Sequence, residues 1–402
     1  MTPICKARGV SGRTPIGPGR FRWLEGELER WRAAGIVDTE AAARIREDYA
    51  PGTKAQATRL FLVLGALLAG VGLIWLIASN LEIEEIGPLM RFAGVALIWL
   101  ALVAAAEAAG RSRFDVLAGP LRLLAVLAYG ATIFQVAQSL QVPAFAPELL
   151  LAWAAGGIVF SYATGAAAAL TLSVAVLGGW FVWGLGERTD TGAAFVIGLG
   201  LAVPAATAIA ALHGEEHERL AEPWWVAAAC FTLVALLSAT FPDFAGSDGL
   251  PAITIVSGAL GALTLCAMAI WRARQRIPEI AGSLLVAVAA VGLTVVAPGT
   301  PDEAFFGPGQ VSGAETAYIL GASAAFLAGA VGVAALGVRR SMPGLTNLAF
   351  LGVLVFVAVQ SFGLIADILS GAALALCVGA ILMVIGLVLD RGRRTLLREA
   401  AP

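Results

Sequence analysis

Two histidines form the pattern in this sequence that most resembles a catalytic metal site. His213 and His217, with Glu216 between them, match the H-x-x-E-H spacing of inverted zinc peptidases. They are the only histidines in the chain, and they lie in a short polar segment between two apolar runs. A third zinc ligand would have to be a nearby acid such as Glu222. The sequence therefore favours a solvated connector here over a zinc site, and it predicts no catalytic residue, metal or cofactor.

A second pattern consists of polar residues inside an otherwise apolar run. Thr132, Gln135, Gln138 and Ser139 fall within about a third of a helix circumference at ~100° per residue. Polar side chains are costly in lipid and usually face the interior of a helical bundle. Two interpretations are open: hydrogen bonds that only hold neighbouring helices together, or the wall of a cavity that carries a small solute.

The elements that must position these residues are long apolar segments. Leu60–Ser79 has no charged residue and, at ~1.5 Å per residue, is long enough to cross a ~30 Å hydrocarbon core as a helix. The whole chain is 59% hydrophobic and only 13% charged, far from the composition of soluble domains. The runs are uniformly apolar rather than alternating, which indicates helices and excludes barrel strands. Further spans are predicted near 91–109, 120–140, 149–164, 167–185, 192–212, 223–241, 251–271, 279–297, 316–337, 345–366 and 369–389. About twelve spans result, and only Gly165 and Ala166 separate the fourth from the fifth.

Basic residues are sorted to one side of this arrangement. If the N-terminus is cytoplasmic and the spans alternate, 24 of the 26 Lys and Arg residues fall in inner segments, with only Arg91 and Arg188 outside. This is the positive-inside distribution of an inner-membrane protein. Both termini are therefore expected in the cytoplasm.

The polar N-terminal region predicts a helical hairpin. After an irregular leader over residues 1–20, two amphipathic helices are expected at Phe21–Ala34 and Thr39–Tyr49, separated by Gly35 and capped by Asp38. Apolar residues at helical spacing form its stripes: Leu24, Leu28, Trp31 and Ile45. We expect these stripes either to dock a cytosolic partner or a second copy of the chain, or to pack on each other. Residues 21–50 hold five arginines against seven acids, which argues against nucleic-acid binding.

Two stretches resemble a bacterial family of predicted membrane proteins known only as a domain of unknown function. Trp31–Asp38 resembles its N-terminal W-x-x-x-G-[IL]-[IV] segment. Gly130–Phe134 with Gln138, followed by Leu151–Ala154, resembles its Gly-Ala-x-Ile…Gln…Trp-Ala pattern. The resemblance covers about residues 23–185, although Leu81 stands where the family has a tryptophan. It implies a bacterial inner-membrane protein with a cytosolic hairpin, and it implies no activity.

The sequence thus predicts an all-α, polytopic membrane protein. Its parts are a leader (1–20), a cytosolic hairpin (21–58), a bundle of about twelve spans (59–390) and a cytosolic tail (391–402). The expected partners are the lipid bilayer and, for the hairpin, a cytosolic protein or another copy of the chain. The expected function is non-enzymatic, with secondary transport of a small solute as the alternative.

Overall fold

The computed structural model describes most of the chain, with gaps. The described residues are 14–16, 18–51, 61–72, 87–112, 115–140, 143, 146–189, 191–213, 217–245, 252–298 and 313–365. By its packing the chain divides into two units. One comprises Met1–Ile83 with Leu100–Leu127, and the other comprises Glu84–Trp99 with Ala128–Pro402.

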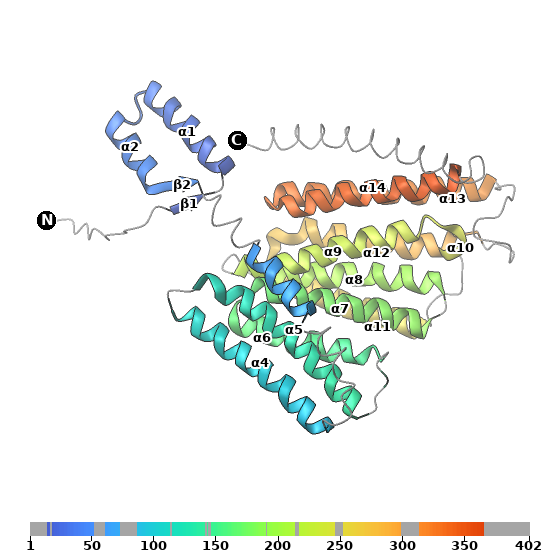
Figure 1. Ribbon diagram of the computed structural model, residues 1–402. Coiled ribbons are helices and arrows are strands. Elements are labelled where there is room, and N and C mark those ends of the chain that lie inside the picture. Colours follow the sequence, from blue (N-terminus) through green and yellow to red (C-terminus); the bar gives the residue numbers. More distant parts are fainter. Residues whose placement is uncertain are drawn as a thin grey trace. The chain divides into compact units, whose positions relative to one another are not determined.

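Helices make up nearly all of the described structure, which confirms the all-α fold class (Figure 1). The long apolar helices are α4 (Pro88–Gly110), α5 (Asp115–Ser139), α6 (Glu148–Thr164), α7 (Ala167–Arg188), α8 (Gly192–Leu212), α9 (Glu218–Ser238), α11 (Ala252–Arg272), α12 (Ile277–Val296), α13 (Gly313–Arg339) and α14 (Pro343–Ile365). Nine described helices are long and apolar enough to cross a membrane, and Phe61–Gly72 and α6 are shorter apolar helices. Each predicted span from the second to the eleventh coincides with one of these helices, and the first is described only over Phe61–Gly72. The twelfth, 369–389, and the tail lie outside the described residues.

The N-terminal hairpin has the predicted helices with slightly different ends. Helix α1 covers Pro18–Ala33 and α2 covers Thr39–Asp48. Gly35 adopts a left-handed φ of 69° after α1, and Asp38 Oδ1 accepts a 2.6 Å hydrogen bond from the Ala41 amide at the start of α2. Both residues therefore act as the sequence predicted.

Part of the predicted leader belongs to regular structure. Thr14–Ile16 forms strand β1, which pairs in parallel with β2 (Tyr49–Pro51). Helix α1 also begins three residues before the predicted Phe21, because Pro18 occupies the first turn, where its missing N–H is not needed. The leader is thus shorter than residues 1–20.

The break between the fourth and fifth predicted spans is real. Gly165 adopts a left-handed φ of 64° after α6, and its amide bonds the carbonyls of Ser161 and Tyr162. A residue with a Cβ would be strained in this conformation. Two residues are therefore enough to reverse the chain into α7.

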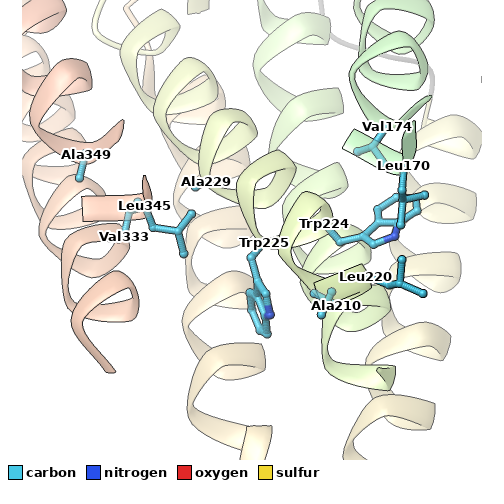
Figure 2. Packing of buried hydrophobic residues seen from close by; sticks show 11 residues of the cluster. Leu170, Val174, Ala210, Leu220, Trp224, Trp225, Ala229, Val333, Leu345 and Ala349 are labelled. Carbon is cyan, nitrogen blue, oxygen red and sulfur yellow. The ribbon is translucent and has the colours of Figure 1, made fainter. Parts of the chain in front are cut away.

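In the second unit, α8 and α9 form the centre. The apolar windows of α8 and α9 are 67% and 61% buried, whereas those of α11 and α13 are 17% and 22% buried. A core cluster surrounds the start of α9 (Figure 2), where Trp224 is directed toward Leu170 and Val174 of α7 and Trp225 points away from them. The more exposed helices α11 and α13 offer the larger apolar surfaces to lipid.

Candidate functional site

A cavity of about 510 Å³ lies between α8, α9, α12 and α13. Small side chains make up much of its wall, including Ala228 and Ala229 of α9 and Gly329 and Gly332 of α13. Small residues normally allow membrane helices to approach closely. Here they leave a volume within the usual range of small-molecule sites.

Three buried hydroxyl groups face this volume. Thr207, Thr232 and Ser283 line the cavity and are 4%, 5% and 6% exposed. Thr232 Oγ1 donates to the Ala228 carbonyl at 2.8 Å, and Ser283 Oγ donates to the Ile280 carbonyl at 2.7 Å. The hydroxyl protons of Thr232 and Ser283 are therefore used within their own helices, which leaves these two oxygens as hydrogen-bond acceptors for a ligand.

A carboxylate lies in the wall of the cavity at the start of α12. The Glu279 side chain is only 4% exposed. Its Oε1 accepts a 2.8 Å hydrogen bond from Arg340 Nη2 and lies 3.5 Å from Arg339 Nη2. Its Oε2 is buried and has no hydrogen-bond partner among the described residues. A buried carboxylate oxygen without a donor is energetically costly, so Glu279 lowers the net stability of this part of the bundle.

The two arginines differ in their surroundings. The Arg340 side chain is 11% exposed, and its guanidinium lies 5.0 Å from the centre of the Trp225 ring. The Arg339 side chain also lines the cavity but is 57% exposed, so most of its donors are accessible. One carboxylate and two guanidinium groups give this cluster a net charge of +1.

These contacts also show which helix ends lie together. Arg340 follows α13, Glu279 lies in the first turn of α12 and Trp225 lies in the N-terminal half of α9, so the end of α13 meets the N-terminal parts of α12 and α9. This arrangement agrees with the alternating threading predicted from the arginine positions. At the opposite end, Tyr318 Oη at the start of α13 donates to the Ala239 carbonyl after α9 at 2.8 Å.

The histidine motif contributes to packing at the same end as Glu279. His213 Nδ1 lies 2.8 Å from the Ile209 carbonyl, and its Nε2 lies 3.0 Å from Tyr162 Oη. Trp224 Nε1 donates to the same Tyr162 oxygen at 2.8 Å. Both nitrogens of His213 therefore have partners, and no group of three or more metal-ligating residues occurs in the described part of the chain. Glu216 lies outside the described residues.

The predicted polar stripe on α5 is only partly buried. Thr132 and Gln135 are 7% and 4% exposed, whereas Gln138 is exposed and Ser139 half-buried. Thr132 and Ser139 each donate to a carbonyl one turn earlier at 2.9 Å, and the buried Gln135 Oε1 has no partner among the described residues. None of the four lines the cavity described above. A role for them in solute binding stays a prediction.

The four residues predicted to dock a partner lie in the core of the hairpin. Leu24 and Leu28 are 9% and 5% exposed and cluster with Ala42, while Trp31 and Ile45 pack against them half-buried. The stripes of α1 and α2 thus cover each other, which is the self-packing alternative. A docking surface on this hairpin would have to use other side chains.

Sequence reasoning missed Glu279 and its two arginines. The predicted span 279–297 places Glu279 at its boundary, and Arg339 and Arg340 serve only to orient the chain. One signal is available in the sequence. Glu279 lies at a span end that is predicted on the same side of the membrane as Arg339 and Arg340, 60 residues later. Opposite charges near inner span ends pair across helices, but sequence alone does not say which helices are neighbours.

Comparison with known proteins supports the family resemblance. Residues 29–170 match the protein family described as "Predicted membrane protein (DUF2157)". No curated protein matches the chain, and no solved structure does. The matched segment contains the hairpin from Glu29 onward, α4, α5 and α6, whereas the cavity is lined by residues between Val203 and Arg339. The family therefore agrees with a membrane protein of unknown function and says nothing about the cavity.

Proposed function

We propose that this chain, which resembles a family of predicted membrane proteins, is a non-enzymatic transporter of a small solute. The observation that carries the proposal is the cavity between α8, α9, α12 and α13, which is lined by the buried hydroxyl groups of Thr207, Thr232 and Ser283. Polar groups within membrane helices usually mark a substrate pathway. The cavity supports transport better than the burial of Leu24 and Leu28 supports a docking role for the hairpin.

The helix that forms one wall of the cavity contains a proline. Pro204 lies inside α8, next to Val203 and three residues before Thr207, both of which line the cavity. Proline removes one backbone hydrogen bond from a helix and allows it to bend at that point. A bend of α8 at Pro204 would change which end of the cavity is open, and this supports the transport proposal.

We place the protein in the bacterial inner membrane, with the end that carries Glu279, Arg339 and Arg340 toward the cytoplasm. The support is the positive-inside distribution of arginines. Reporter domains fused at Asp243 and Arg274 should then lie in the periplasm and the cytoplasm, respectively. Two reporters in the same compartment would contradict the threading.

Cysteine accessibility tests the transport proposal. In a chain with its four native cysteines replaced, Thr232→Cys should react with a charged, membrane-impermeant thiosulfonate added from either side of oriented vesicles. The matched control is Ala208→Cys on α8, because Ala208 is fully buried and does not line the cavity. The control should not react from either side. If Thr232→Cys reacts from one side only, or from neither, the cavity does not exchange between the two faces and the proposal fails.

A further inference from the structure

The cavity stops short of one end of the bundle, where α8 and α13 start and α9 and α12 end. Helix α8 lines the cavity only from Val203 onward, α12 only as far as Ala289 and α13 only from Ala325 onward. Beyond this level α8 and α12 are in close contact, because a Cβ built on Gly200 would lie 2.5 Å from Ala290 Cβ, nearer than real Cβ atoms approach other atoms. The space between these two helices is therefore closed on the far side of the cavity.

A short segment after α9 covers the same end of the bundle. It comprises residues 239–245 and includes the four-residue helix α10 (Pro242–Ala245). Phe244 packs on a buried cluster from α8, α12 and the residue that follows α9, namely Val196, Ala290 and Ala239. Ala245 is fully buried against Tyr318 of α13. The segment thus continues α9 and contacts the other three helices that enclose the cavity.

Two side-chain hydrogen bonds attach this segment to helices that are distant in sequence. Tyr318 Oη donates to the Ala239 carbonyl at 2.8 Å, and Gln360 Nε2 of α14 donates to Thr240 Oγ1 at 3.0 Å. Thr240 is only 2% exposed and donates its own proton to the Leu237 carbonyl at 2.7 Å, so its oxygen is available to accept from Gln360. Both attachments can break without the unfolding of any helix.

We infer that residues 239–245 form a gate at this end of the cavity, which is closed in this structure. The hydrogen bonds from Tyr318 and Gln360 hold the segment in place. When they break, Phe244 can leave α8, and the cavity opens toward the side of the membrane that carries Tyr318. The inference rests on the proposed function, because a transporter must open its cavity to each side in turn.

Labelling rates in oriented vesicles test the gate. The reporter is Thr232→Cys in the chain without native cysteines, with the charged thiosulfonate added only on the side of Tyr318. Tyr318→Phe removes the bond to Ala239 and should raise the labelling rate from that side about fivefold, because the loss of one hydrogen bond shifts the equilibrium between closed and open forms by roughly that factor. The labelling rate from the opposite side should stay the same or fall.

Tyr162→Phe is the matched control. It makes the same chemical change at a tyrosine whose hydrogen bonds, to His213 and Trp224, lie at the other end of the bundle. It should leave the labelling rate from the Tyr318 side unchanged, although it also removes contacts between helices. An equal rise in Tyr162→Phe would show a general loosening of the bundle and overturn the inference.

A second variant keeps the gate testable if Tyr318→Phe does not fold. Gln360→Met removes the bond to Thr240 and should raise the labelling rate from the same side, as Tyr318→Phe does. An unchanged rate in either folded variant would overturn the inference.

The gate and the transport proposal can fail separately. If Thr232→Cys alone is not labelled from the Tyr318 side, transport fails, but labelling that appears there in Tyr318→Phe still supports the gate. If Thr232→Cys is labelled from both sides at rates that neither variant changes, transport stands and the gate is refuted.

Discussion

Substitution of one glycine on α5 tests how α5 and α6 pack. A Cβ built on Gly130 would lie 2.7 Å from Trp153 Cζ2 and 2.5 Å from Cδ2, closer than real Cβ atoms approach other atoms. The Trp153 ring is itself held in an edge-to-face contact with Phe134, with centroids 6.4 Å apart. Gly130→Ala therefore forces the ring to move, which costs about 1–3 kcal/mol. The gain in helix propensity offsets about 0.5–1 kcal/mol of this.

The expected net loss for Gly130→Ala is therefore up to about 2.5 kcal/mol in the free energy of unfolding. Gly261→Ala on α11 is the matched control, because nothing lies within 4 Å of a Cβ at Gly261. This control should be neutral or stabilising. Unfolding of both variants by a steric-trap or denaturant titration in bicelles gives the difference. If Gly130→Ala is as stable as Gly261→Ala, the inferred contact with Trp153 is wrong.

A double-mutant cycle separates this contact from helix propensity. Trp153→Ala removes the ring that a Cβ at Gly130 would meet. In that background Gly130→Ala should no longer destabilise the protein, so the two changes should couple by 1 kcal/mol or more, about the size of contacts between direct neighbours. Additive effects would show that the ring is not the obstacle.

Three further predictions concern other parts of the chain. Arg340→Met should cost about 3 kcal/mol in unfolding free energy, because it leaves the buried Glu279 carboxylate without its closest partner. Arg339→Met should cost less than about 1 kcal/mol, because the Arg339 side chain is 57% exposed. Equal losses in a thermal unfolding assay would contradict the geometry. Tyr162→Phe removes two hydrogen bonds to an indole and an imidazole, so it should lower unfolding free energy by about 1–3 kcal/mol in the same assay, and an unchanged midpoint would refute this. If the hairpin docks a cytosolic partner, deletion of residues 21–50 should reduce the number of proteins that the chain captures in a pull-down. An identical set of captured proteins would remove that prediction.

Local sequence patterns predicted the elements well, for a simple physical reason. In lipid every backbone N–H and C=O must be paired within the protein, so a long apolar run has little choice but a helix. Short-range signals such as Gly165 at a left-handed turn and Asp38 at a helix start are likewise local. These are the features that the sequence could reveal, and they were found at the expected residues.

The neighbours of each helix could not be predicted in the same way. Leu170 is fully buried and Leu285 is 69% exposed, yet both lie in uniformly apolar helices whose sequence gives no preferred face. The cavity depends on such preferences, because α8, α9, α12 and α13 each line it with only some of their residues. Thr132 and Gln135 were correctly expected to face inward, but the hydroxyl groups of Thr207, Thr232 and Ser283 are isolated in sequence and formed no visible stripe.

The Glu279 cluster contributes little net stability to the bundle, as buried ion pairs generally do. Apolar residues of similar volume in place of a buried ion pair are often neutral or stabilising by about 1–4 kcal/mol. The cluster here is less favourable than a fully hydrogen-bonded pair, because Glu279 Oε2 is buried without a donor among the described residues. The cavity walls beside this cluster are made of small residues, whose lost packing contacts a ligand can replace. This loss of packing is unfavourable in an empty bundle and is recovered when a ligand occupies the cavity, which is the relation expected if the transport proposal holds.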